Sequence, residues 1–247
     1  SLGYDFMAIT DHNMAPSEAQ WHTWQSQANL VLIPGEENGN TDHILELGVL
    51  AVTDTPSDNI VERAAVLEKS GAFIAGCHPQ EYDHGAENIH AAVDILHAFE
   101  IYNGLRENRG CDEASNIAIW DNVLTKGHRI WGIATDDFHC QYTSPGKGWV
   151  CVQVPEEDET ITWQTLVQQL KKGAFYASTS PSFDQIIFDE QTLTVKCDRY
   201  VQEIRIVGPE GRTVFQTEGS RLEWAVEPDL TYFRIEGHCG VRRIWSQ

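Results

Sequence analysis

The sequence predicts an α/β domain followed by a small antiparallel β-sandwich, and three observations support this. In residues 1–180, short apolar runs alternate with segments whose apolar residues have helical spacing. The connections between these segments are short, as in parallel βα units. After Ser180, only short runs of alternating polarity remain, separated by turns that contain Gly, Pro or Asp. We therefore expect an α/β domain over residues 1–180, with its strands in a barrel or an open sheet, and a sandwich over residues 181–247.

The strands of the first domain are predicted from β-branched and aromatic residues in short runs that end in Gly or polar residues. These runs are residues 6–9, 30–34, 44–52, 72–77, 98–103 and 130–134. Helices are predicted at 17–27, between Ser57 or Asp58 and Gly71, around 91–96, at 113–126 and at 163–172. Ser17 is a suitable N-cap for the first helix, and Gly127 and Gly173 are suitable ends for the last two.

Six short runs after Ser180 predict the strands of the sandwich, because turn residues separate them at regular spacing. They are residues 186–188, 193–196, 203–207, 213–215, 222–226 and 231–235.

Composition restricts the function. The 247 residues carry a formal net charge of −20, which argues against nucleic-acid binding because that needs clustered Lys and Arg. A compact acidic substrate would need a metal ion or particular Arg residues to bind here. No apolar run approaches the length of a membrane span. The six cysteines form no C-x-x-C pair, which favours reduced thiols in a cytoplasmic protein: Cys77, Cys111, Cys140, Cys151, Cys197 and Cys239.

Imidazole and carboxylate side chains recur next to the predicted strands. They are His12, Glu37, His43, His78, Asp137 and His139. A single histidine at a strand end is more often a hydrogen-bonded structural residue. A set of six at the same edge of a sheet favours a metal site, and nitrogen and oxygen ligands of this kind suit Zn, Mn or Fe. A Ser-His-Asp hydrolase is disfavoured, because the sequence lacks a G-x-S-x-G motif.

These residues lie in motifs that resemble the PHP (polymerase and histidinol phosphatase) family of metal-dependent phosphoesterases. The motifs are residues 9–13 (ITDHN), 35–37 (GEE), 43–45 (HIL), 75–79 (AGCHP) and 135–139 (TDDFH). Residues 173–181 (GAFYASTSP), 234–236 (RIE) and 244–246 (IWS) resemble the C-terminal β domain of one bacterial subgroup. The resemblance covers nearly the full chain and implies a distorted (β/α)7 barrel before the sandwich.

The resemblance also implies a site and a reaction. Members hold two or three divalent ions, and an activated water or hydroxide attacks phosphorus. Glu37 would bridge two ions, and His43 and His78 would complete the second. Asp137 would hold the first ion, and His12 with His139 the third, so that Asp137 and His139 serve in catalysis. We expect one to three ions of Zn, Mn or Fe per chain and a small-molecule phosphate ester as substrate, with no nucleic-acid or membrane partner.

The sequence departs from the family at its start. Members carry an H-x-H pair at the end of the first barrel strand, and this strand is absent from the chain as given. We expect a further segment upstream of Ser1 that supplies it. The alternative is a catalytically eroded PHP-like module that binds a ligand or partner, and an upstream H-x-H would favour the enzyme.

Five further residues have open roles. Asn103 lies in the family's E-x-Y-N strand, where it could line the substrate pocket or cap the next turn. Arg106 and Arg109 could bind a phosphate, although a solvated loop Arg is the default. Asp136 could orient a metal-bound histidine or cap the following turn. Lys147 lies between two glycines and resembles a phosphate-binding loop only loosely.

Overall fold

The chain forms two compact units of mixed α/β structure. The computed structural model describes residues 2–55, 57–82, 84–108, 113–139, 144–156 and 160–247. The first unit contains residues 1–100 and 152–174, and the second contains residues 101–151 and 175–247. Helices and strands alternate in the first part of the chain, and antiparallel sheets dominate the last part. This confirms the α/β class and the change of character toward the C-terminus.

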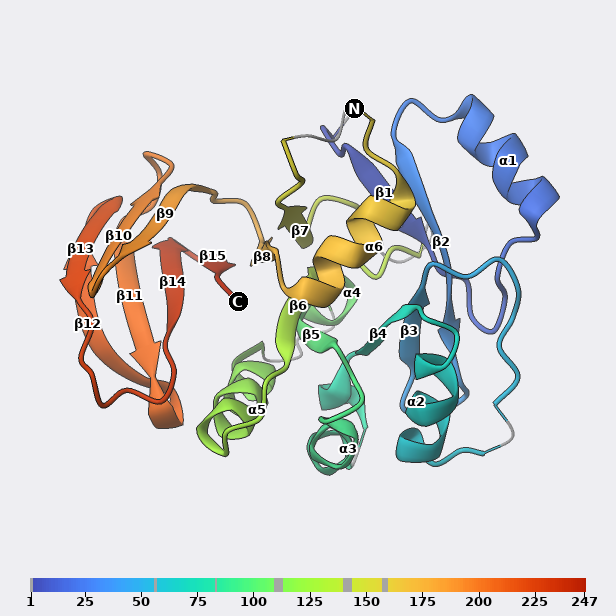
Figure 1. The fold of residues 1–247 in the computed structure, drawn as a ribbon, viewed down its shortest axis with the longest axis horizontal. Coiled ribbons are helices and arrows are strands. Elements are labelled where there is room, and N and C mark those ends of the chain that lie inside the picture. Colours follow the sequence, from blue (N-terminus) through green and yellow to red (C-terminus); the bar gives the residue numbers. More distant parts are fainter. Residues whose placement is uncertain (1, 56, 83, 109–112, 140–143, 157–159) are drawn as a thin grey trace. The chain divides into compact units, whose positions relative to one another are not determined.

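The first unit is built from short buried strands and the helices that connect them (Figure 1). Its strands are β1 (Phe6–Ile9), β2 (Val31–Asn38), β3 (Ile44–Leu47) and β4 (Phe73–Gly76). Its helices are α1 (Glu18–Gln27), α2 (Ile60–Glu68), the 3-10 turn η1 (Pro79–Glu81), α3 (Gly85–Ala92) and α6 (Trp163–Lys172). Strand β5 (Ala98–Asn103) crosses the boundary between the units.

Strands β1 to β6 form one sheet in sequence order. The pairs β1–β2 and β4–β5 are parallel, as predicted. Strand β3 is antiparallel to both β2 and β4, so the prediction of parallel strands is wrong there. The physical reason is the link of five residues, 39–43, because a parallel pair needs a crossover of about a dozen residues or more. As a consequence, the end of β2 and the start of β3 lie at the same edge of the sheet.

The ends of α1 and α6 follow the local sequence signals. Ser17 is the N-cap of α1, and it forms a capping box with Gln20, in which each side chain accepts a hydrogen bond from the other residue's backbone N–H. Gly173 ends α6 in the left-handed conformation, with φ of 73°. Both predicted helices are confirmed within a residue of their predicted bounds.

Helices α2 and α3 differ from the prediction. Asn59 is the N-cap of α2, in place of Ser57 or Asp58, because its Oδ1 accepts hydrogen bonds from the N–H groups of Val61 and Glu62 at 3.0 and 3.1 Å. Helix α3 begins at Gly85 and ends at Ala92, so the predicted helix around residues 91–96 lies too far along the chain.

The second unit begins with helices and strands that precede the sandwich. These are α4 (Gly104–Asn108), α5 (Glu113–Thr125), β6 (Trp131–Thr135), β7 (Trp149–Val152) and β8 (Phe175–Ser178). The prediction included α5 and β6 but missed α4, β7 and β8.

The C-terminal strands form two antiparallel sheets that share one core (Figure 1). They are β9 (Phe183–Asp189), β10 (Thr192–Cys197), β11 (Glu203–Gly208), β12 (Arg212–Glu218), β13 (Arg221–Ala225), β14 (Arg234–Cys239) and β15 (Arg242–Trp245). The sheet orders are β13-β10-β9 and β12-β11-β14-β15-β8-β7. Val195 and Trp224 of the first sheet and Ile206 and Ile244 of the second belong to one buried cluster. The strand predicted at 231–235 is shifted to β14, and β15 was not predicted.

Two sequence expectations concern the chain as a whole. None of the helices in the described ranges is long and apolar enough to cross a membrane. Within the described residues, Cys77, Cys151, Cys197 and Cys239 are reduced cysteines, and Cys111 and Cys140 lie outside those residues.

A buried ionic network ties α5 to β14 within the second unit. Arg234 donates to both carboxylate oxygens of Asp121, at 2.9 and 3.0 Å, and also to Glu236. Glu236 in turn lies 3.0 Å from Nε2 of His238. Burial by itself raises the pKa of Glu236, but the bonds from His238 and the Arg234 guanidinium outweigh it and lower that pKa to about 2. The network therefore contains a buried cation between two carboxylates.

Replacing this cation should destabilise the second unit. Arg234→Met leaves Asp121 and Glu236 buried without their cation, and we expect a loss of about 3–5 kcal/mol in unfolding free energy. Urea unfolding followed by tryptophan fluorescence measures it. Arg205→Met is the control, because Arg205 pairs with Glu203 where both are partly exposed, and it should cost less than about 1 kcal/mol. Equal losses in the two variants would contradict the assignment.

Two carboxyl groups face each other across β2 and β3. Glu36 and Glu46 are directly opposite in the strand register, and both are fully buried. The N–H of Thr53 donates to Glu36 at 2.9 Å, and the hydroxyl of Ser70 donates to Glu46 at 2.7 Å. Burial raises the pKa of Glu46 to about 7, and the neighbouring Glu36 carboxylate raises it as well. The hydrogen bonds from Ser70 and Thr53 lower this pKa but do not outweigh burial.

The raised pKa predicts a loss of stability with rising pH. The folded protein keeps a proton on Glu46 that the unfolded chain releases near pH 4.5, so unfolding free energy falls between pH 4.5 and about 7, by up to about 1.4 kcal/mol per unit. Glu46→Gln removes this part of the pH dependence because the amide cannot ionise. Urea midpoints at pH 5, 6, 7 and 8 test it against the exposed control Glu223→Gln. Parallel pH curves for wild type and Glu46→Gln would refute it.

Candidate metal centre

The carboxylate of Glu37 is the centre of a cluster of imidazoles in the first unit. Glu37 lies near the end of β2 and is 7 % exposed. Its Oε1 lies 2.6 Å from Nδ1 of His43 and 3.1 Å from Nε2 of His78. Its Oε2 lies 3.7 Å from Nδ1 of His12. The structure therefore brings together four of the six ligands that the sequence predicts.

The environment of Glu37 keeps it ionised. Burial alone raises the pKa of a carboxyl group, because it disfavours the charged form. For Glu37 this effect is outweighed by the hydrogen bonds to His43 and His78 and by the charges of His12 and His78, and the pKa falls well below its ordinary value. The group is a buried carboxylate, which is the form that ligates a cation.

Three different strands deliver the imidazoles. His12 follows β1 and forms a parallel bridge with Glu37, supported by a hydrogen bond from the N–H of Asn13 to the carbonyl of Glu37 at 3.0 Å. His43 directly precedes β3, at the edge where β2 ends. His78 follows β4. The ring centroids of His12 and His43 are 4.8 Å apart, and those of His43 and His78 are 5.2 Å apart.

His78 is held by its own surroundings. Its backbone has φ of 27°, a conformation that non-glycine residues rarely adopt. The N–H of His78 donates to Oε2 of Glu100 at 2.6 Å, and its Nδ1 lies 3.1 Å from Oε2 of Glu81. The ring of Tyr82 packs 5.4 Å from the ring of His78. Because the Glu37 carboxylate only accepts hydrogen bonds, Nε2 of His78 is the donor in the bond between them.

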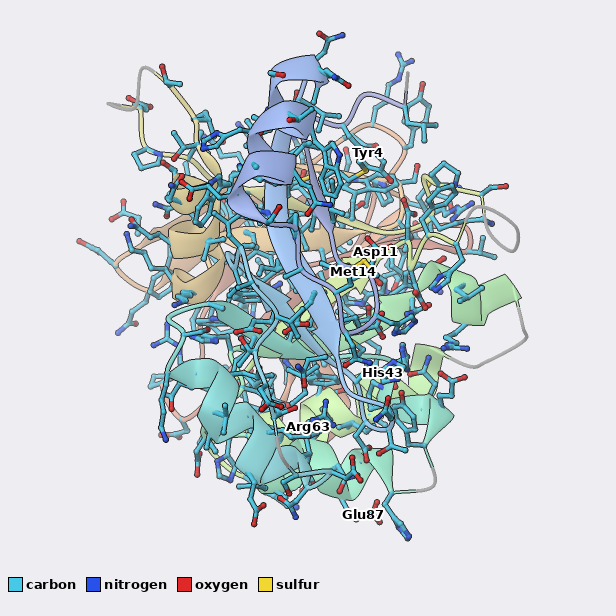
Figure 2. All side chains as sticks on the ribbon, turned by 90° about the vertical axis from the view of Figure 1, so that its right-hand side faces the viewer. Tyr4, Asp11, Met14, His43, Arg63 and Glu87 are labelled. Carbon is cyan, nitrogen blue, oxygen red and sulfur yellow. The ribbon has the colours of Figure 1, made fainter. Side chains whose placement is uncertain are left out.

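Arg63 organises the loop between Glu37 and His43. Its guanidinium, 1 % exposed, donates to the carbonyls of Thr41 and Asp42 at 2.8 and 3.2 Å and also to the carbonyl of Asn38. Figure 2 labels His43 and Arg63 near the carboxyl end of β2. Because Arg63 binds three carbonyl groups of this loop, it fixes the turn that sets the spacing between Glu37 and His43.

Arg63 was not predicted from the sequence, although its position carries a signal. Arg63 lies on the apolar stripe of α2 with Ile60, Ala64 and Leu67, and all four are buried. A charged residue on a buried stripe needs hydrogen-bond partners, so this position predicts a structural or functional role.

The donor set fits a divalent metal ion. The ligand atoms of His12, Glu37 and His43 all lie within 4.8 Å of one another. Two ligands of one zinc ion are at most about 4 Å apart, since each bond is about 2.0–2.1 Å, so small side-chain adjustments suffice. The family resemblance pairs His12 with His139, whereas this geometry places His12 beside Glu37 and His43. Imidazole with carboxylate suits Zn, Mn or Fe.

The two remaining predicted ligands lie in the second unit. Asp137 follows β6, with φ of 47°, and its Oδ2 accepts a hydrogen bond from Nδ2 of Asn103 at 3.1 Å. Nδ1 of His139 lies 3.3 Å from Oδ1 of Asp137. Arg106 is buried, and Arg109 lies outside the described residues. Membership of Asp137 and His139 in the cluster around Glu37 stays a prediction.

Comparison with known proteins gives a similarity of fold. No protein-family model and no curated protein sequence matches the chain. The structure resembles that of a two-domain protein from Bacteroides vulgatus ATCC 8482 that contains a predicted PHP-like metal-dependent phosphoesterase. The match has a TM-score of 0.50 and 14% sequence identity, and it covers 99% of this chain and 78% of that chain. The chain therefore shares the fold of a two-domain PHP-like protein at low sequence identity.

Proposed function

We propose that this protein is a metal-dependent phosphoesterase of the PHP type, with the sheet of β1 to β6 as part of a distorted (β/α)7 barrel. The observation that carries the proposal is the buried Glu37 carboxylate, which has ring nitrogens of three histidines within 3.7 Å. The fold similarity to a protein described as containing a PHP-like phosphoesterase supports the same reaction class. The proposed substrate is a small-molecule phosphate ester, and the proposed location is the cytoplasm.

Six residues would hold the ions in this proposal. Glu37, with His12, His43 and His78 as nitrogen ligands, would hold divalent ions, and Asp137 and His139 are the two further proposed ligands. Divalent ions of Zn, Mn or Fe supply Lewis-acid chemistry, since they lower the pKa of water and neutralise phosphoryl oxygens.

The other residues orient these ligands and hold protons. Glu81 faces Nδ1 of His78, so that Nε2 of that ring would be the nitrogen that ligates an ion. Asn103 fixes one oxygen of Asp137, and the other oxygen lies beside Nδ1 of His139. A proton on that Nδ1 would make Nε2 of His139 the nitrogen that ligates an ion. Asp137 and His139 are the proposed catalytic residues.

Metal binding should depend on the cluster. We expect Glu37→Gln and His43→Ala to weaken binding of Zn²⁺ or Mn²⁺ by at least about 100-fold, because each removes a direct ligand, whereas loss of an outer partner costs about 10–100-fold. Isothermal titration of the metal-free protein measures the change. His22→Ala is the matched control, because His22 lies exposed on α1 beside Glu18. Wild-type affinity in Glu37→Gln would remove the basis of the proposal.

Hydrolysis should depend on both the metal and Asp137. The protein loaded with Mn²⁺ or Zn²⁺ should cleave p-nitrophenyl phosphate, and removal of the metal with EDTA should stop the reaction. Asp137→Ala should lower the rate to below about one hundredth, since charge stabilisation by the metal is worth several kcal/mol. Release of p-nitrophenol is the measurement. An Asp137→Ala variant as active as wild type would exclude Asp137 from catalysis.

A further inference from the structure

The carboxylate of Asp136 binds three successive backbone N–H groups. Its Oδ1 accepts from Lys147 at 2.6 Å and from Gly148 at 3.1 Å, and its Oδ2 accepts from Gly146 at 3.0 Å. All of these residues belong to the second unit. Of the two roles that the sequence left open for Asp136, these bonds support the capping of a following turn. Asp136 thus fixes the backbone of Lys147 next to Asp137.

Close backbone approach explains the glycines around this turn. Gly146 has φ of 87°, a conformation that favours glycine. A Cβ at Gly148 would lie 2.7 Å from Cδ1 of Tyr102 and 2.8 Å from the carbonyl oxygen of Thr135. The turn is therefore pressed against the ends of β5 and β6.

The same packing sets the direction in which Lys147 leaves the turn. A Cβ at Gly104 would lie 2.6 Å from Cβ of Lys147 and 3.0 Å from the carbonyl oxygen of Asp136. The stem of Lys147 therefore crosses Gly104, directly after Asn103, whose amide binds the carboxylate of Asp137. Lys147 is partly exposed, whereas Arg106, the cation expected to bind phosphate, is only 8 % exposed.

The negative net charge of the chain indicates a role for Lys147 in anion binding. A phosphate ester is an anion, and the chain carries a formal net charge of −20. Anion binding on such a chain needs a cation held close to the reacting group. Lysine is a common phosphate-binding residue, and its long stem places the ammonium away from the backbone that anchors it.

We propose that Lys147 binds the phosphoryl group of the substrate and that Asp136 is the positioning residue that holds Lys147 over Gly104. This inference rests on the proposed function, because it assigns the anion contact of the same phosphoesterase site. The phosphate-binding cation is then Lys147 on the turn of residues 146–148, and not Arg106 of α4, the residue that the sequence suggested.

Phosphate affinity tests the inference separately from catalysis. Inorganic phosphate is titrated calorimetrically into the full chain with and without Mn²⁺, and KM and kcat are measured for p-nitrophenyl phosphate. Lys147→Gln should raise the Kd of phosphate and the KM about 10- to 100-fold, the range for loss of a charge-assisted hydrogen bond, with a smaller effect on kcat. Lys147→Arg should retain most of the affinity because it keeps the charge.

A second variant and a control complete the test. Asp136→Asn keeps the lysine at position 147 but weakens the hydrogen bonds that hold the turn. It should therefore raise the same Kd and KM. Lys126→Gln removes an exposed lysine after α5 and should change neither value. A phosphate Kd in Lys147→Gln within twofold of wild type would overturn the inference, as would a wild-type protein that binds no phosphate. A wild-type protein that binds phosphate through Lys147 without hydrolysis would support the inference and refute the proposed function.

Discussion

The buried negative charge of Glu37 is the constraint on which the first unit depends. A carboxylate removed from water is costly unless positive or hydrogen-bonding groups compensate it. Here the compensation comes from His12, His43 and His78, which reach Glu37 from three different strand ends. The strand arrangement is therefore coupled to the electrostatics of one side chain. The same arrangement directs several nitrogen ligands at one carboxylate, which is what a divalent cation requires.

Backbone strain occurs directly after strands in both units. His78 and Asp137 both have positive φ, as does Asn13 directly after His12. Such conformations cost about 1–3 kcal/mol each and persist only where the surrounding structure holds them. The surroundings do so here, since Glu100 binds the N–H of His78 and Asn103 binds the carboxylate of Asp137. These contacts hold two candidate ligands in backbone conformations that cost stability.

The chain buries acidic groups in three different ways. Glu37 is compensated by imidazoles, and Glu236 is compensated by the guanidinium of Arg234. Glu46 lies opposite Glu36 and avoids the cost of a buried charge because burial favours its protonated form. The difference follows from the neighbours: basic side chains reach the first two carboxylates, and the hydroxyl groups of Ser70 and Thr53 reach the third. Of these three groups, the one surrounded by histidines has the chemistry of a metal site.

The sequence by itself determined the features that depend on neighbouring residues. Helices α5 and α6, strand β5 and the Ser17 cap follow from periodicity and local hydrogen bonds, and the motifs around His12, Glu37, His43 and His78 named the candidate ligands that the structure brings together. Tertiary structure decided the hydrogen bonds of Arg63 to the loop after β2 and those of Asp136 to residues 146–148. These contacts join groups ten or more residues apart, and long-range packing, which leaves no local periodic signal, sets their geometry.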